Sequence, residues 1–150
     1  MGAFLARPPI WEVFHDNPYI HTSTFGGNPL AARAALAAIH VLREEGIAEK
    51  CAQRGAELLA GVSRIAAEFS EIITDVRGKG LLVGAQFADA DIGNLVIAGL
   101  AQHNILTAFT LNRPEVVRLE PPAVITSEEI EQVVTAFRES VASAKELLQL

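Results

Sequence analysis

The sequence predicts an α/β chain, and more closely an α+β domain with helices over one small sheet. From about residue 70 onward, short extended runs alternate with helical patterns, as is typical of this class. Amphipathic helical patterns over 47–69 and after Thr126 supply apolar faces that can pack on such a sheet. The length of 150 residues suits one domain with its own hydrophobic core.

The first 20 residues are predicted to be irregular, because Pro8-Pro9 and the turn sequence Asp16-Asn17-Pro18 interrupt them. The short apolar stretch Gly2–Ala6 has strand character, but a strand needs partners for its backbone groups. No such partner is near it in the sequence. We therefore expect it to be the end of a sheet whose other strands lie outside this chain.

A helix is predicted over 30–45, with Asn28 and Pro29 as its opening pair and Gly46 as its end. Its run Leu30–Ile39 is apolar on nearly every face, and a helix that is apolar all round is normally buried all round. This chain has little with which to wrap it. We therefore expect a large partner surface to cover it.

The remaining elements follow from hydrophobic spacing. The helix over 47–69 has one buried stripe, made of Ile47, Cys51, Leu58, Val62, Ile65 and Phe69. Extended segments are predicted at 72–76, 81–87, 105–109 and 116–119, with turns at 77–80 and 112–114. Asp91 is the predicted cap of a short helix that ends near His103. Thr126 and Glu129 form a capping box that opens the last helix. The stripe of that helix contains Ile130, Val133, Val134, Phe137, Val141 and Ala144.

Composition narrows the class of protein. Half of the residues are hydrophobic, a fifth are charged, and the mean hydropathy is +0.28. This is apolar for a soluble domain, so we expect part of the surface to be covered by something else. The net charge of −6, with both signs scattered, argues against nucleic acid as a partner. The sequence shows no signal peptide and no membrane-spanning run, and Cys51 is the only cysteine, so we expect a soluble cytoplasmic chain.

Two glycine-containing turns are candidates for phosphate binding. The turn Thr24–Asn28 precedes a helix, where free N–H groups and the helix dipole both attract an anion. An ordinary Gly-Gly turn with an Asn cap is the alternative that the local sequence favours. The stretch Arg77–Gly80 lacks the frame of a Walker A loop, so a flexible turn is favoured there as well.

Other reactive side chains give weaker signals. Arg118 is either a surface residue or a carboxylate-binding fork that reaches into a cleft, and its local sequence leaves both open. No metal site is expected, because Cys51 has no partner and no metal-ligand spacing joins His15, His21, His40 and His103. A Schiff-base lysine needs a dry pocket, and no such setting surrounds Lys50, Lys79 or Lys145.

One motif resembles a family signature. The stretch His21–Ala31, HTSTFGGNPLA, closely resembles the pattern H-x-[ST]-T-[FY]-G-G-N-P-L-[AG] of class III aminotransferases, which include ornithine, acetylornithine, 4-aminobutyrate and putrescine aminotransferases. Three further matches follow in the family's order, at 76–84 (VRGKGLLVG), 117–122 (VRLEPP) and 126–130 (TSEEI). The resemblance covers essentially the whole chain.

The resemblance implies the fold type I of pyridoxal-phosphate enzymes, which has a large domain and a small α/β domain. Residues 1–45 would then be a remnant of the large cofactor-binding domain plus the connecting helix, and residues 46–150 the C-terminal small domain. It also implies that Thr24, with Ser23 beside it, binds the phosphate of pyridoxal 5′-phosphate in a site shared across a homodimer. Arg118 is implied as a contact for a substrate carboxylate or as an ion-pair partner.

The same resemblance implies that catalytic parts are missing. The family's Schiff-base lysine, the Asp that partners the pyridine nitrogen and the aromatic residue that stacks on the ring belong to an upstream segment that this chain lacks. No catalytic residue is therefore expected here, and weak phosphate binding is the most the chain could do alone. Details of the motifs are most similar to putrescine-type enzymes, with ornithine or acetylornithine as the alternative substrate. A free-standing binding or assembly module, or complementation by a separately encoded N-terminal half, are the competing interpretations.

Overall fold

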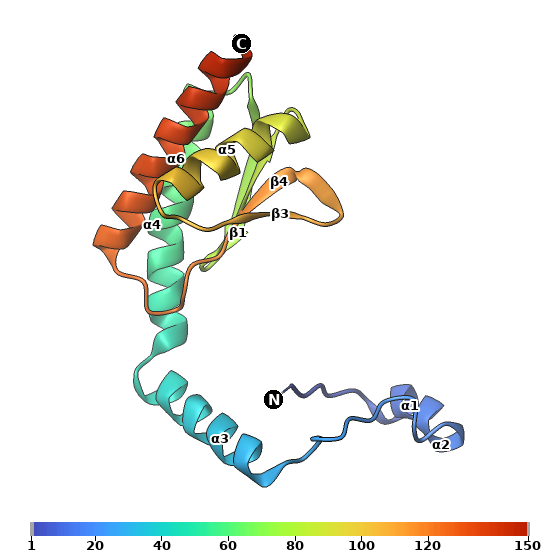
Figure 1. Cartoon of the computed structure of the whole chain (residues 1–150). Coiled ribbons are helices and arrows are strands. Elements are labelled where there is room, and N and C mark those ends of the chain that lie inside the picture. The colour runs from blue at the N-terminus through green and yellow to red at the C-terminus, as the bar shows by residue number, and fades with distance from the viewer. Residues whose placement is uncertain (1, 150) are drawn as a thin grey trace. The chain divides into compact units, whose positions relative to one another are not determined.

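A computed structural model describes residues 2–149 of the chain (Figure 1). The chain divides into two compact units, with the boundary between Glu45 and Gly46. No helix within the described residues is both long and apolar enough to cross a membrane.

The first unit contains two single-turn helices and one long helix. These are α1 (Pro8–Trp11), α2 (Val13–Asp16) and α3 (Pro29–Glu44). The stretch Gly2–Ala6 has no regular structure in the described part of the chain, and its assignment to a sheet outside this chain stays a prediction. A strand exists only when a second backbone satisfies its polar groups, and no described segment supplies one. The first 20 residues are also less irregular than predicted, because α1 and α2 lie within them.

Helix α3 begins where the sequence predicted. The side-chain oxygen of Asn28 accepts hydrogen bonds from the backbone N–H groups of Leu30, at 3.0 Å, and Ala31, at 3.1 Å. Pro29 occupies the first helical position, where a missing N–H costs nothing. The Asn-Pro pair therefore sets the start of the helix by local chemistry.

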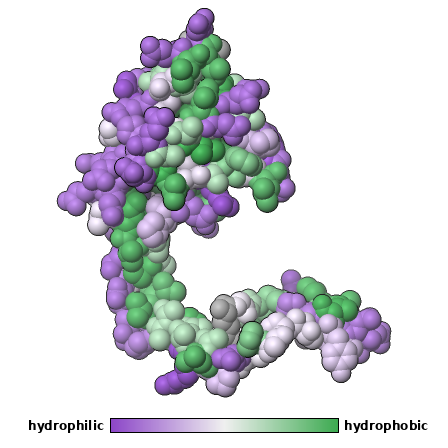
Figure 2. All heavy atoms as spheres, viewed as in Figure 1, coloured by the Kyte–Doolittle hydropathy of each residue, from purple (hydrophilic) through white to green (hydrophobic). Residues whose placement is uncertain are grey.

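The surface of α3 is mostly apolar and exposed. Figure 2 shows apolar side chains on this segment, and none of the residues of α3 is buried. Polar residues do share one side, since Arg33, His40 and Glu44 fall together at helical spacing and His40 pairs with Glu44 at 3.1 Å. Leu36 and Ile39 are 60% and 52% exposed. The polar side is thus made mostly by residues beyond the apolar run Leu30–Ile39, and the need of the helix for a covering surface stays a prediction.

The second unit contains a four-stranded antiparallel sheet. Its strands are β1 (Ile73–Lys79), β2 (Leu82–Phe87), β3 (Ala108–Thr110) and β4 (Arg113–Leu119), in the order β1-β2-β4-β3. The predicted turn at 77–80 is shorter than expected, because pairing with β2 extends β1 to Lys79. Gly80 makes the tight turn with a φ of +56°, a conformation that favours glycine.

Three helices gather on one side of this sheet (Figure 1). They are α4 (Ile47–Glu68), α5 (Ala90–Gln102) and α6 (Ser127–Leu148). Helices α4 and α5 contact the strands, and α6 packs across both of these helices. The cap of α5 is Asp89, whose carboxylate accepts from the N–H of Asp91, so the prediction of Asp91 as the cap is wrong by two residues. The capping box of Thr126 and Glu129 is confirmed.

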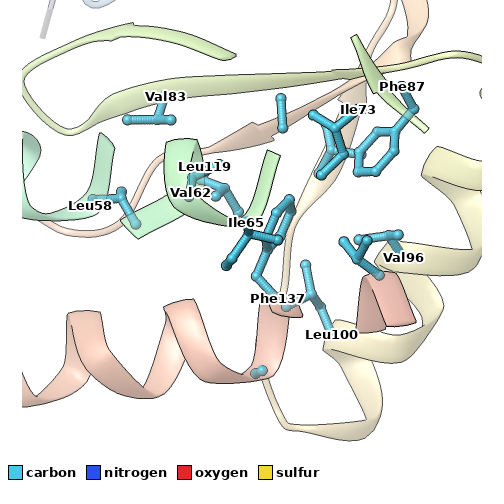
Figure 3. Packing of buried hydrophobic residues seen from close by; sticks show 14 of the residues in the cluster. Leu58, Val62, Ile65, Ile73, Val83, Phe87, Val96, Leu100, Leu119 and Phe137 are labelled. Atoms are coloured by element: carbon cyan, nitrogen blue, oxygen red, sulfur yellow. The ribbon is translucent and has the colours of Figure 1, made fainter. Parts of the chain in front are cut away.

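The core lies between the sheet and the helices (Figure 3). Alternate residues of β2 face it, with Val83, Ala85 and Phe87 at most 1% exposed. The helices contribute the other side, with Leu58, Val62, Ile65, Val96, Leu100 and Phe137. Each large side chain buried in this way contributes about 2 kcal/mol. The predicted stripes of α4 and α6 therefore form the core, although Cys51, Val133 and Val134 are only half-buried.

Glycine sets the close contact between α4 and the turn that joins β1 to β2. A Cβ atom at Gly55 would overlap the backbone of Gly80 and lie 2.5 Å from its Cα atom. Backbone atoms cannot move aside as a flexible side chain can. The first turns of α4 can therefore approach this hairpin only because position 55 lacks a side chain.

We expect Gly55→Ala to lower the free energy of unfolding by about 2 kcal/mol or more, because the new methyl group forces α4 away from Gly80. Urea unfolding followed by far-UV circular dichroism measures this change. Gly93→Ala in α5 is the matched control, because a Cβ atom there lies at an ordinary contact distance of 3.5 Å from Val117. Alanine also has a higher helix propensity than glycine. Equal stability of Gly55→Ala and the wild type would show that the contact imposes no constraint.

A surface network joins the end of α4 to α6. The Arg138 guanidinium donates to both carboxylate oxygens of Glu68, with Nε to Oε2 at 2.9 Å, and Lys145 donates to Glu71. The two cations lie over the ring of Phe69, at 6.0 and 5.9 Å from its centroid. The hydrogen bond from Arg138 lowers the pKa of Glu68, and the hydrogen bond from Lys145 lowers the pKa of Glu71.

These shifts predict loss of stability in acid. A carboxyl group whose pKa is lower in the folded state contributes stability above its unfolded pKa, near 4.5, and loses it as the pH falls through the folded value. The stability difference between the wild type and a Glu68→Gln, Glu71→Gln double variant should therefore shrink between neutral pH and about pH 3. Chemical unfolding at several pH values measures it, with Glu146→Gln as an exposed control. A difference that is independent of pH would contradict the prediction.

Candidate functional site

The candidate site is the turn that leads into α3. Two successive turns shape it, closed by hydrogen bonds from the Gly26 N–H to the Ser23 carbonyl and from the Asn28 N–H to the Phe25 carbonyl, each 3.1 Å. Gly27 has a φ of +70°, which a residue with a side chain rarely adopts. The chain therefore reverses twice within six residues and then enters the helix.

The helix start itself is not free to bind an anion. The N–H groups of Leu30 and Ala31 are already bound to the Asn28 side chain, and Pro29 has no N–H. The expectation of free N–H groups at this helix start is therefore wrong, and the Asn-capped turn describes its geometry. Any anion would have to be held by the turn before the helix.

That turn presents neutral donors to solvent. Ser23 and Thr24 are exposed. Among the hydrogen bonds of residues 2–149, none engages the Thr24 hydroxyl or the backbone N–H groups of Thr24, Phe25 and Gly27. A hydroxyl and several amide N–H groups within a few residues are a donor set that suits a phosphate dianion. The donors of this part of the chain therefore fit a phosphate group.

Arg118 belongs to the second unit and lies on the face of the sheet that points away from the helices. It stands in register with Gly84 of β2 and Ala108 of β3. Its side chain is 50% exposed, and its Nε atom lies 3.2 Å from Oε2 of Glu120. Of the two alternatives left open for Arg118, the structure thus shows an exposed side chain whose guanidinium faces a carboxylate of its own strand end.

Sequence reasoning missed the neighbours of Arg118 on this face. Arg77 lies on the other side of Gly84, pairs with Asp75 and donates to the Gln86 side chain at 3.2 Å. Residues at alternate positions of a strand share a face, so the grouping could have been found only once the strand register was known.

None of the lysines has the setting of a Schiff-base residue. Lys145 is held by Glu71, and Lys50 and Lys79 are exposed. No group of His, Cys, Asp and Glu side chains within the described residues could hold a metal ion. Cys51 is half-buried and its Sγ atom donates to the Ala123 carbonyl at 3.6 Å. The described residues therefore hold a phosphate-type donor set, and their lysines are exposed or ion-paired.

Known proteins match this chain along most of its length. Residues 1–141 match the family model Aminotransferase class-III. The lysine aminotransferase of M. tuberculosis is 26% identical, with a TM-score of 0.76 over 85% of this chain and 29% of its own. The ornithine aminotransferase of Plasmodium yoelii is 31% identical, with a TM-score of 0.74 over 85% of this chain and 33% of its own.

A Bacillus anthracis aminotransferase is 30% identical, with a TM-score of 0.75 over 83% of this chain and 30% of its own. The chain thus spans about a third of the length of these enzymes or less. The resemblance seen in the sequence and the predicted α/β fold are both confirmed. The chain belongs to the class III aminotransferase family, and its mixed α/β fold matches one part of the structures of that family.

Proposed function

We propose that this chain is the C-terminal portion of a pyridoxal-phosphate-dependent class III aminotransferase and is inactive alone. The parent enzyme would move an amino group from an amine or ω-amino acid, such as putrescine, ornithine or acetylornithine, to a 2-oxo acid. The observation that carries the proposal is a family match over residues 1–141, beside a structural match that covers only 29% of the lysine enzyme. Its lysines are exposed or ion-paired, which supports the proposal that the chain is inactive alone.

Ser23 and Thr24 are the proposed cofactor contacts. Their exposed hydroxyls and the unpaired N–H groups of the turn would hold the phosphate and thereby orient the rest of the cofactor. The bound cofactor would supply an electron sink for transamination. This chain would contribute the anchor, and other protein would contribute the acid–base groups.

Arg118 is the proposed contact for a substrate carboxylate. A guanidinium binds carboxylates in a fork, and Glu120 already faces its Nε atom at 3.2 Å. Exchange of Glu120 for a substrate carboxylate would let one arginine serve both an amine donor and a 2-oxo acid acceptor.

The proposed partners are the missing large-domain part and a second copy in a cytoplasmic homodimer. The first unit would then be a remnant of the large domain, with α3 as the connecting helix. The exposed apolar residues of α3 support this assignment, since Leu30 is 81% and Leu36 60% exposed. The second candidate function is a free-standing binding or assembly module, which the closed core of the second unit supports.

Phosphate binding should depend on the Thr24 hydroxyl. We expect Thr24→Val to weaken the affinity for pyridoxamine 5′-phosphate roughly tenfold or more, because a charge-assisted hydrogen bond is lost. Thr24→Ser keeps the hydroxyl and is the matched control. Pyridoxamine 5′-phosphate lacks an aldehyde, so surface lysines cannot react with it, and pyridoxamine without phosphate tests for ring binding. Titration calorimetry measures the affinities, and equal values for all three proteins would contradict the assignment.

The chain alone should not transfer amino groups. With pyridoxal phosphate, putrescine or ornithine, and a 2-oxo acid, we expect no amino acid product, because no lysine is placed to react. Co-expression with the upstream part of a class III aminotransferase should restore turnover. Product formation by the purified chain alone would refute the proposal of an incomplete enzyme.

The two candidate functions differ in their association state. An incomplete enzyme should self-associate through exposed apolar surface, whereas a free-standing module should be monodisperse. Size-exclusion chromatography with light scattering distinguishes them. A stable monomer or a defined oligomer that forms without any partner would favour the module.

A further inference from the structure

Four aromatic rings cluster in the first unit ahead of the candidate site. Phe4 stacks on Trp11 with ring centroids 5.2 Å apart, and Trp11 lies 5.0 Å from Phe14. The His21 ring closes the group, with its centroid 4.9 Å from Phe4 and 6.3 Å from Phe14, edge-on to both. Edge-to-face geometry is the favourable arrangement for such rings. The cluster thus ties His21 to residues much earlier in the chain.

This cluster is what orders the segment before the turn. Helices α1 and α2 have four residues each, which is too short for stability on their own. The Trp11 indole N–H donates to the Ala6 carbonyl at 2.9 Å and fixes the stretch that carries Phe4. Ring packing and this hydrogen bond therefore supply the order that helix formation alone cannot.

The candidate site lies between two fixed points. His21 is held by the aromatic rings, and Asn28 is held by the first turn of α3. Only six residues separate them, and two turns already shape that span. A short loop fixed at both ends loses little conformational entropy when a ligand binds.

We infer that His21 is a positioning residue, whose ring contacts with Phe4 and Phe14 hold the entry of the Thr24 turn in its binding conformation. This rests on the proposed role of Thr24 as the phosphate contact. His21 itself need not touch the phosphate. It acts through the backbone that joins it to Ser23 and Thr24. The packing of its ring on Phe4 and Phe14, more than its nitrogen atoms, holds this backbone in place.

The test uses the full chain and two substitutions at one position. His21→Ala removes the ring, and His21→Phe keeps a ring of similar size. We expect His21→Ala to weaken pyridoxamine 5′-phosphate binding roughly threefold to tenfold, and His21→Phe to restore it, since an aromatic pair contributes modestly. Loss of affinity in both variants alike would overturn the inference, because the ring alone would then not suffice.

An independent readout follows the turn itself. Heteronuclear ¹H–¹⁵N relaxation of the amides of Thr24 to Gly27 should show faster motion in His21→Ala and wild-type order in His21→Phe. Trp11 is the only tryptophan, so its fluorescence reports whether the remaining rings stay packed. We expect its emission to stay unchanged, which separates local positioning from collapse of the cluster. Unchanged amide motion in His21→Ala would overturn the inference.

The two readouts separate this inference from the proposal on which it rests. If Thr24→Val binds as well as the wild type, the phosphate contact at Thr24 fails whatever His21 does. If Thr24→Val loses affinity but His21→Ala does not, only the positioning role fails. If the wild type binds no pyridoxamine 5′-phosphate, the relaxation data still decide whether His21 orders the turn.

Discussion

The approach of α4 to the β1–β2 turn is the constraint on which the second unit depends. Gly55 and Gly80 meet backbone to backbone, and this contact sets how deeply the stripe of α4 reaches under the sheet. The depth of α4 in turn leaves room for α6 to pack across it and across α5. Strand β2 pairs with both β1 and β4, and its register with β4 places Arg118 beside Gly84.

The first unit is built on a different principle. Its described residues, 2–45, form no closed apolar core, and their order comes from an aromatic cluster at one end and a helix cap at the other. The turn between them presents only neutral donors, which bind a dianion well where water is excluded and weakly where it is not. Such a site gains strength when further protein closes over it. This behaviour agrees with the anchoring role proposed for Thr24.

Features that depend on neighbouring residues were predicted correctly from the sequence, whereas features that depend on contacts between distant segments were not. The capping box of Thr126 and Glu129 is local, and it was correctly predicted from four consecutive residues. The extension of β1 through Arg77 and Gly78 was missed, because pairing with β2 overrides the turn preference of the glycines. The cap of α5 was placed on Asp91 because two aspartates compete there, and only Asp89 has the extended backbone of a cap.

In the candidate site, too, the local features were predicted from the sequence and the long-range features were not. Local chemistry alone favoured an Asn-capped turn over a phosphate site, and the bonds of Asn28 agree with it. The role proposed for Thr24 came from resemblance to a family, because a binding role depends on protein and ligand outside the turn. The pairing of Arg118 with Glu120 depends on side-chain directions at the end of β4, which the sequence pattern does not encode.

The second unit closes its own hydrophobic core, whereas the large apolar residues of α3 in the first unit stay exposed. Hydrogen exchange, measured by mass spectrometry at a protein concentration low enough to keep the chain monomeric, tests whether the two units differ in stability in this way. We expect strong protection of amides in β2, β4 and α6, and rapid exchange along α3, whose apolar side has no cover in the described chain. Protection of α3 equal to that of α6 in the monomer would contradict it.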